Sequence, residues 1–292
     1  MNTPLKLLSI AKLITNWFLA NPRSYPWRQN ITPYHIWISE VMLQQTRVQT
    51  VIPYYNKWLK IFPNVLSLSK SNLQTVLKQW EGLGYYSRAK NISRSSKIIV
   101  EQFNKKIPNT YEKIISLPGI GIYIAGAILS IAYNNPIPAI DGNVKRVFSR
   151  ICEFNFLNTS DNKQLHQILS NILLLTEPKY FNQAIMDLGR YICTPKKPAC
   201  HICPINSLCI AYQNSTVNKF PTKTKKLKRP HYNVAVGIVN KQNKLLITKR
   251  PTDILLGGLW EFPGGKIKKG ETIKECIKRE LYEEIGIHVE PT

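Results

Sequence analysis

The sequence predicts a mainly α-helical domain followed by a smaller α+β segment, and three observations support this prediction. Apolar residues recur at helical spacing across residues 5–210, and prolines separate the helical runs. Four cysteines near residue 200 lie close enough in sequence to bind one inorganic centre. After a basic stretch the pattern changes to β-rich runs and one charged helix. A chain of 292 residues is long enough for two domains with separate cores.

The change of pattern places the domain boundaries. We expect a helical domain over residues 1–212, a basic linker over 213–230 with no apolar period, and a second domain over 231–292. In the second domain "VAVGIV" and "KLLITKR" are β-rich runs, and "NKQN" between them predicts a hairpin. The run "TIKECIKRELYEEIG" predicts the charged helix.

The charge is uneven along the chain. The net charge is +23, and residues 1–229 hold 30 Lys and Arg against 9 Asp and Glu, a net of +21. Such an excess on one region favours a polyanionic partner, with nucleic acid the first choice. The alternative is a solvated basic surface that reflects a composition rich in Asn, Ile and Lys.

The cysteines are expected to be metal ligands in a reducing, intracellular setting. The apolar stretch after Met1 is interrupted by Lys6 and Lys12, so it does not resemble a secretory signal, and no apolar run is long enough to span a membrane. Two structural disulfides are therefore not favoured. Cys152 and Cys276 stand apart and are expected to be small apolar residues.

The spacing of the remaining cysteines is specific. Cys193, Cys200, Cys203 and Cys209 follow the pattern C-x6-C-x2-C-x5-C. The C-x2-C core alone is also typical of zinc sites. The whole pattern resembles the cluster loop of the helix-hairpin-helix DNA glycosylases, the superfamily of endonuclease III. The resemblance implies a [4Fe–4S] cluster with a structural role, and phosphate contacts from Lys196 and Lys197.

Two further motifs extend this resemblance over the first two-thirds of the chain. "LPGIG", residues 117–121, joins two helical runs, and Gly119 and Gly121 would let the backbone approach a DNA phosphate at the start of the next helix. A plain helix turn explains this motif equally well when it is taken alone. "IDGNVKRV" places Asp141 as an N-cap, a position that favours the ionised carboxylate. The resemblance places Asp141 on the essential aspartate of the superfamily.

Glu40 and Tyr123 indicate the adenine-specific members of this superfamily. Glu40 lies among apolar neighbours in "WISEVMLQQTRV", where burial would raise its pKa and let it donate a proton. A solvent-facing helix residue is the alternative. The run resembles the catalytic helix of the adenine-specific enzymes, which makes Glu40 the general acid and Asp141 the group that stabilises the sugar cation. Tyr123 stands where strand-cleaving relatives carry a nucleophilic lysine, which predicts a monofunctional glycosylase.

The resemblance also suggests residues that contact the DNA and the base. Gln45 and Tyr85 match positions that wedge into the duplex when the base leaves the stack, although either could be an ordinary core or surface residue. The residues expected to line the adenine pocket are Trp27, Arg28, Gln183 and Asp187. Further expected DNA contacts are Arg88, Lys90, Asn143, Lys145 and Arg146, although any one of the basic residues could be merely solvated.

The C-terminal segment resembles a Nudix domain. The run from Gly265 to Ile287 fits G-x5-E-x7-R-E-U-x-E-E-x-G-U, where U is aliphatic, and Glu280, Glu283 and Glu284 share one helix face. Three such carboxylates suit Mg²⁺, and a solvated acidic helix is the alternative. The longer run resembles 8-oxo-dGTP pyrophosphohydrolases. Because the chain stops eight residues after Glu284, and a Nudix core needs roughly as much chain again, this segment is expected to be incomplete.

Together these features predict a monomeric bacterial DNA repair enzyme in the cytoplasm, associated with the nucleoid. The predicted activity is excision of adenine mispaired with 8-oxoguanine or guanine in double-stranded DNA. The alternatives are an endonuclease III-like lyase, a nucleotide-pool pyrophosphohydrolase with a DNA-binding appendage, and an inactive DNA-binding relic.

Overall fold

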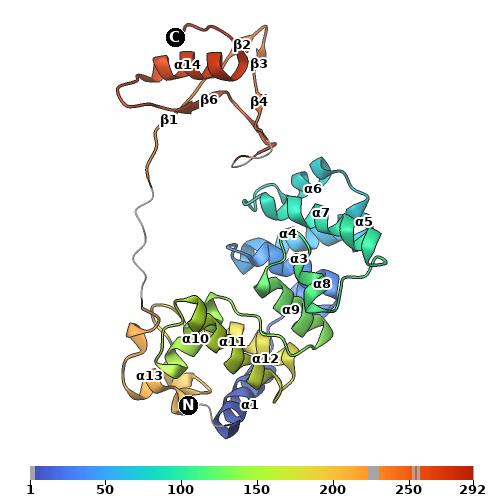
Figure 1. Cartoon of the computed structure of the whole chain (residues 1–292), viewed down its shortest axis with the longest axis vertical. Coiled ribbons are helices and arrows are strands. Elements are labelled where there is room, and N and C mark those ends of the chain that lie inside the picture. Colours follow the sequence, from blue (N-terminus) through green and yellow to red (C-terminus); the bar gives the residue numbers. More distant parts are fainter. Residues whose placement is uncertain (1–3, 223–229, 252–253, 255–256, 292) are drawn as a thin grey trace. The chain divides into compact units, whose positions relative to one another are not determined.

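The computed structural model describes residues 4–222, 230–251, 254 and 257–291, and divides into two compact units, Met1–Lys223 and Thr224–Thr292 (Figure 1). The predicted linker residues 223–229 and part of the run "RPTDILL" lie outside the described residues. Within the described residues no helix is both long and apolar enough to cross a membrane. The predicted monomeric state and cellular location stay predictions.

The first unit is helical, as predicted. Its helices are α1 (Pro4–Ala20), α2 (Pro26–Gln29), α3 (Pro33–Leu43), α4 (Val48–Ile61), α5 (Val65–Ser69), α6 (Leu73–Trp80), α7 (Ser87–Gln102), α8 (Tyr111–Ile115), α9 (Ile122–Tyr133), α10 (Gly142–Cys152), α11 (Thr159–Leu173), α12 (Pro178–Tyr191) and α13 (Ile210–Gln213). Short polar residues begin several of them because their side chains accept a hydrogen bond from a free backbone N–H of the first turn. Thr32, Asn72 and Asp141 do so for α3, α6 and α10.

Two hydrophobic clusters form the core of this unit. The larger is built from α2 to α9 and contains the fully buried Trp37, Trp58 and Trp80. The smaller joins α10, α11 and α12 with α1, which lies beside α12 although it begins the chain (Figure 1). Met186 on α12 packs against both clusters. Met186 therefore marks the place where the two halves of this unit, each built around one cluster, meet.

The predicted linker is shorter in the structure. Its first residues fold against the first unit, where a 3₁₀ turn covers Val217–Lys219. The Arg150 Nε donates to the carbonyls of Val217 and Phe220 at 3.1 and 2.9 Å. The absence of an apolar period suggested free chain, but backbone carbonyls paired with a buried guanidinium hold this segment instead.

The second unit is α+β. Its strands are short: β1 (Val234–Val236), β2 (Asn240–Lys241), β3 (Lys244–Leu245), β4 (Thr248–Lys249), β5 (Trp260–Glu261) and β6 (Gly264–Lys266). They form three antiparallel pairs, β1 with β6, β2 with β3 and β4 with β5. A hairpin forms at the predicted place, with Gln242 and Asn243 at its turn at φ of 51° and 61°, but its strands are β2 and β3, and β1 in the run "VAVGIV" pairs with β6 instead. Helix α14 (Ile273–Ile285) begins at a Thr272 capping box and ends at Gly286.

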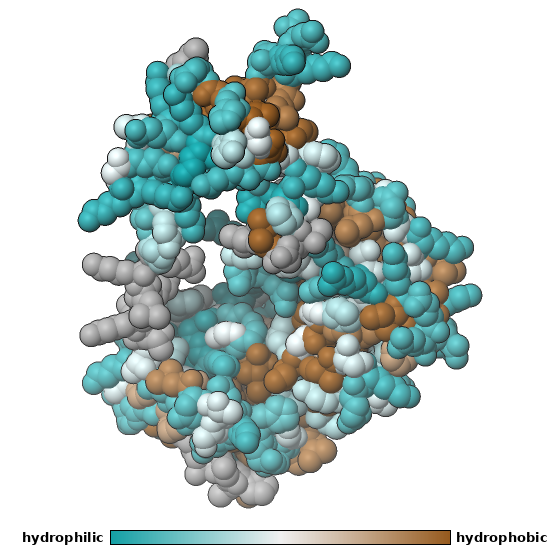
Figure 2. Space-filling view, turned by 45° about the horizontal axis from the view of Figure 1, so that its top comes forward, coloured by the Kyte–Doolittle hydropathy of each residue, from teal (hydrophilic) through white to brown (hydrophobic). Residues whose placement is uncertain are grey.

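Hydrophilic residues cover most of the face shown in Figure 2, and apolar residues form separate patches on it. In the second unit the burial of β1 alternates, so that Ala235 is buried while Val234 and Val236 are exposed. Period-2 alternation of this kind is typical of a strand that packs on one side only.

Candidate active site

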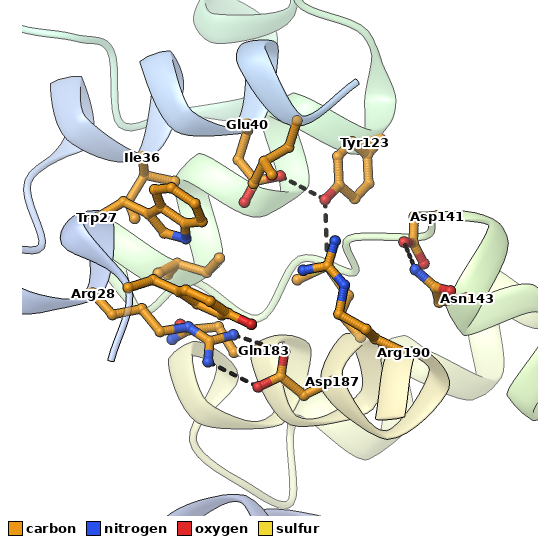
Figure 3. Close-up of a pocket in the computed structure, with 14 residues that line it drawn as sticks. Trp27, Arg28, Ile36, Glu40, Tyr123, Asp141, Asn143, Gln183, Asp187 and Arg190 are labelled. Atoms are coloured by element: carbon orange, nitrogen blue, oxygen red, sulfur yellow. Dashed lines mark hydrogen bonds and ion pairs between the residues drawn. The ribbon is translucent and has the colours of Figure 1, made fainter. Parts of the chain in front are cut away.

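Side chains from α2, α3, α9, α10 and α12 meet in one pocket of about 140 Å³ (Figure 3). This is roughly ten times the volume that a single water needs, so the pocket has room for a small ligand. The predicted residues that line it are Trp27, Arg28, Glu40, Tyr123, Asp141, Asn143, Gln183 and Asp187. The structure thus brings the predicted catalytic and base-pocket residues together.

Glu40 is buried in the wall of this pocket. It lies on α3 and is 6% exposed, and its Oε2 accepts a 2.6 Å hydrogen bond from the Tyr123 hydroxyl. Burial raises the pKa of the Glu40 carboxyl to about 7, the hydrogen bond from Tyr123 lowers it, and the charge of Asp141 raises it. A carboxyl with this pKa holds a proton for much of the time near neutral pH, which a general acid requires.

Asp141 is held in a different way. It is the N-cap of α10, and its Oδ1 accepts from the backbone N–H of Val144 at 2.8 Å. Its Oδ2 accepts from Nδ2 of Asn143 at 2.7 Å (Figure 3). The two hydrogen bonds fix the orientation of the carboxylate, and the N-terminus of α10 places a positive partial charge beside it. The two carboxylates therefore occupy contrasting environments in one pocket.

Tyr123 is the second residue of α9, two positions after the end of the "LPGIG" turn. Its hydroxyl contacts Sδ of Met186 at 3.3 Å as well as Glu40. Burial raises the pKa of this phenol well above its usual value, so it stays a neutral donor. None of the described residues that line the pocket is a lysine.

An ion pair between Arg28 and Asp187 forms the wall of the pocket across from Glu40. Nη1 and Nη2 of Arg28 donate to the two carboxylate oxygens of Asp187 at 2.8 and 2.9 Å (Figure 3). Trp27 is buried beside them and stacks on Tyr25 with ring centroids 5.2 Å apart. Nε2 of Gln183 donates to the Lys179 carbonyl at 2.8 Å, which fixes the orientation of its amide.

Six lining residues were not predicted. They are Tyr25, Ile36, Leu43, Ile131, Met186 and Arg190. Helical spacing could have found Arg190, because positions 183, 187 and 190 stand at i, i+4 and i+7 on one face of α12. The apolar members carried no comparable signal, since core residues of any helix look the same in sequence.

The predicted wedge residues lie on two loops. Gln45 follows α3 and Tyr85 precedes α7, both are exposed, and both have positive φ, 55° and 47°. In the helix hairpin, Gly119 has φ of 78°, and a β-carbon there would lie 2.6 Å from Cβ of Asn91. Gly121 is the N-cap of α9, so the free N–H groups of its first turn remain open to an anion.

Arg88 is wrong as a predicted phosphate contact, while Arg146 is partly exposed and makes hydrogen bonds inside the protein. Arg88 is buried, and its guanidinium donates to backbone carbonyls of two segments. Arg146 donates to the carbonyls of Cys193 and Gly189 and to Oδ1 of Asn143. A guanidinium already paired inside the protein has few donors left for a phosphate. Because Lys90, Lys145 and Arg146 are partly exposed, their predicted phosphate contacts stay predictions.

The four predicted cluster ligands gather around one apolar pocket. Cys193, Cys200, Cys203 and Cys209 line it, together with aliphatic residues and Arg150. Nη1 of Arg150 lies 3.1 Å from Sγ of Cys193. Four sulfur donors around a largely apolar space, with a cation beside one of them, fit an iron–sulfur cluster with thiolate ligands.

The Nudix-like glutamates lie on α14, as predicted. Arg279 forms ion pairs with Glu271, Glu280 and Glu283 at 2.6, 2.8 and 3.2 Å. Burial raises the pKa of Glu284. The glutamates of α14 do not converge on a site for a metal ion, and among the described residues no three His, Cys, Asp or Glu side chains, the four cysteines included, are spaced to hold a single ion. The Mg²⁺ site therefore stays a prediction.

Three family matches agree with this architecture. Residues 38–173 match the HhH-GPD superfamily of base excision DNA repair proteins. Residues 193–209 match the iron–sulfur binding domain of endonuclease III, and residues 229–292 match the NUDIX domain. The segment with the four cysteines thus coincides with a known iron–sulfur domain.

Comparison with curated proteins decides the family. An adenine DNA glycosylase of Buchnera aphidicola from Schizaphis graminum is 41% identical over 91% of this chain and 78% of its own length. The chain belongs to the adenine DNA glycosylase family. A human adenine DNA glycosylase is 32% identical over 92% of this chain and 60% of its own length. Membership of this family confirms the predicted base excision chemistry on adenine in DNA.

Solved structures confirm the fold of the first unit. A thermostable thymine-DNA glycosylase superposes with a TM-score of 0.66 at 25% identity, and covers 72% of this chain and 97% of its own. An endonuclease III trapped in a covalent DNA intermediate superposes with a TM-score of 0.63 at 20% identity, and covers 74% of this chain and 99% of its own. The helix-hairpin-helix fold is therefore shared across glycosylases of different specificity.

Proposed function

We propose that this adenine DNA glycosylase removes adenine paired with 8-oxoguanine or guanine and leaves the DNA backbone intact. The observation that carries the proposal is the buried Glu40, whose pKa of about 7 contrasts with the capped carboxylate of Asp141 in the same pocket. Two carboxyl groups in such different environments suit the roles of proton donor and charge stabiliser.

In the proposed reaction Glu40 donates its proton to a ring nitrogen of the adenine, and the glycosidic bond electrons leave with the base. Positive charge then develops on the sugar, where the fixed carboxylate of Asp141 stabilises it. Tyr123 orients the Glu40 carboxyl through the 2.6 Å hydrogen bond. Water completes the reaction at the sugar and leaves an abasic site.

The absence of a lysine among the described lining residues supports a monofunctional enzyme. Strand cleavage by a lyase needs an amine that forms a Schiff base with the sugar, and the Tyr123 phenol cannot form one. The endonuclease III-like alternative has no support in this pocket.

The adenine must leave the duplex to reach this pocket. We assign its binding to Trp27, Arg28, Gln183 and Asp187, of which Arg28, Gln183 and Asp187 lie across the pocket from Glu40 (Figure 3). The exposed Gln45 and Tyr85 are the side chains that would fill the gap in the base stack. The net charge of +23 supports binding to the phosphate backbone.

The four cysteines would hold a [4Fe–4S] cluster, which when bound would brace the loop over residues 193–209. Lys196 and Lys197 on this loop are exposed and are proposed to contact phosphates. We propose that the second unit recognises the base opposite adenine. Mg²⁺ at Glu280, Glu283 and Glu284 would offset the repulsion among these carboxylates.

The test is Glu40→Gln in single-turnover reactions on a duplex with adenine opposite 8-oxoguanine, followed by hot alkali. The unsubstituted protein should give cleavage at the adenine only after alkali. Glu40→Gln should bind the duplex with unchanged affinity and excise nothing, while Glu81→Gln, at an exposed position, should be fully active. Excision by Glu40→Gln, or cleavage without alkali, would contradict the proposal.

A further inference from the structure

Arg88 connects two segments that are far apart in the sequence. Its side chain is buried, with the residue 9% exposed. Nη1 donates to three carbonyls of the first segment, those of Val41, Met42 and Gln44 at 2.9, 3.0 and 2.7 Å. Nη2 donates to two carbonyls of the second segment, those of Leu83 and Gly84, both at 3.0 Å. One guanidinium therefore fixes the backbone of both.

The first segment is the end of the helix that carries Glu40. The carbonyls of Val41 and Met42 belong to the last turn of α3, where carbonyl groups lack a partner within the helix. A cation at this end also complements the helix dipole. The planar guanidinium presents several N–H groups in fixed directions, which an ammonium group cannot do.

Each segment leads directly to a predicted wedge residue. Gln45 follows the held carbonyl of Gln44, and Tyr85 follows the held carbonyl of Gly84. Both have positive φ, 55° and 47°, a conformation that residues with a side chain keep only where the surrounding structure imposes it. Both are exposed, and the Arg88 guanidinium lies 5.6 Å from the centroid of the Tyr85 ring.

We propose that Arg88 is a positioning residue that holds Gln45 and Tyr85 in the geometry with which they enter the duplex beside the extruded adenine. The inference rests on the proposed function, in which these two side chains fill the gap. Insertion into a stacked duplex pushes back on both loops, and loops anchored through their backbone resist that force. Arg88 acts through them and touches neither the base nor the reacting bond.

The test uses Arg88→Lys, which keeps the charge and loses the planar set of donors. We expect excision of adenine opposite 8-oxoguanine to slow by about tenfold to a hundredfold under single turnover. Amide hydrogen exchange over residues 43–46 and 83–86 should become faster. Ile99→Ala is the matched control, because it opens a cavity in the same helix three turns away and leaves both loops intact.

A cycle with Gln45→Ala/Tyr85→Ala separates positioning from a general loss of structure. If Arg88 acts through these residues, adding Arg88→Lys to the double variant should slow excision no further. A further slowing by the full factor, or an unchanged rate for Arg88→Lys, would overturn the inference. If Gln45→Ala/Tyr85→Ala excises adenine at the normal rate, the inference is also overturned, because these side chains would then not be needed to fill the gap in the base stack. Excision by the unsubstituted chain is measured first. If it excises no adenine, that result contradicts the proposed function and not the role of Arg88.

Gly84→Ala serves if Arg88→Lys does not fold. Gly84 has φ of 70° and no atom lies within 4 Å of an added β-carbon, so the substitution strains only the loop backbone that Arg88 holds. It should slow excision in the same direction and show the same lack of additivity with Gln45→Ala/Tyr85→Ala. An unchanged rate for a folded Gly84→Ala variant would count against the inference.

Discussion

The hydroxyl of Tyr123 donates a 2.6 Å hydrogen bond to Oε2 of Glu40 and joins α9 to α3 across the active-site pocket. The bond links residues that are 83 positions apart in the sequence. It acts against the effect of burial, because it favours the ionised form of a carboxyl whose pKa burial has raised. The pKa of Glu40 is therefore set by two opposing effects, the burial of its carboxyl, which raises it, and the hydrogen bond from Tyr123, which lowers it.

Tyr123→Phe should raise the pKa of Glu40 above about 7, because it removes a hydrogen bond that lowers this pKa. Since the protonated acid is the active form, excision should persist to higher pH than in the unsubstituted enzyme. Single-turnover rates between pH 5 and pH 9 would show the shift. Tyr133→Phe on the same helix removes a hydroxyl bonded to the Ile107 carbonyl and is the control. A profile that moves to lower pH would contradict the prediction.

Glu40→Gln should stabilise the folded protein at alkaline pH. The pKa of Glu40 is raised from 4.5 to about 7 in the folded state, so the wild-type protein loses stability as the pH rises through this interval. The gain in the free energy of unfolding should be small below pH 4.5 and reach about 3 kcal/mol above pH 7. Urea denaturation at pH 4.5 and pH 8.5 measures it, and an equal effect at both values would show that burial of the charge is not the cause.

Asp187→Asn should destabilise the first unit by about 3 kcal/mol, because it leaves the largely buried guanidinium of Arg28 without its partner. The side chains of Arg28 and Asp187 are only 15% and 5% exposed. Denaturant unfolding would measure the loss. Glu81→Gln breaks the exposed pair with Lys78 and should change stability little, so equal effects of the two variants would be evidence against a special role for the buried pair.

Lys196→Ala/Lys197→Ala should weaken DNA binding and reduce its dependence on salt. If each lysine neutralises one phosphate, the slope of log K against log salt concentration should fall by about 2. Binding to a duplex titrated at several salt concentrations provides the slope. Lys57→Ala/Lys60→Ala removes the same charge from exposed positions on α4. An equal change of slope in both variants would mean that the cysteine loop makes no special contact.

Much of the site could be predicted because its signals are local in the sequence. Asp141 caps α10 through an atom three residues away, and the cysteines of the cluster loop span only residues 193–209. Helix caps, turn glycines and short ligand spacings depend on neighbouring residues, so the sequence displays them directly. The glutamates of α14 were placed on one helix face for the same reason.

The error at Arg88 arose because burial decides the role of a charged residue. Arg88 and Arg146 are of the residue type that commonly contacts phosphate, yet both donate to carbonyls inside the protein. The start of the predicted linker is held by Arg150 in the same way. No local pattern announces such pairing, because the carbonyls that accept from Arg88 belong to segments up to 47 residues away.

The sequence by itself determined which helices form, where the proposed catalytic carboxylates lie along the chain and which cysteines are candidate ligands, because these follow from short-range spacing. Only the tertiary structure decided the properties of these groups. Glu40 becomes an acid with a pKa of about 7 because distant helices exclude water and Tyr123 reaches it from α9. Desolvation and long-range pairing depend on how the helices pack, and the linear order of residues does not contain that packing explicitly.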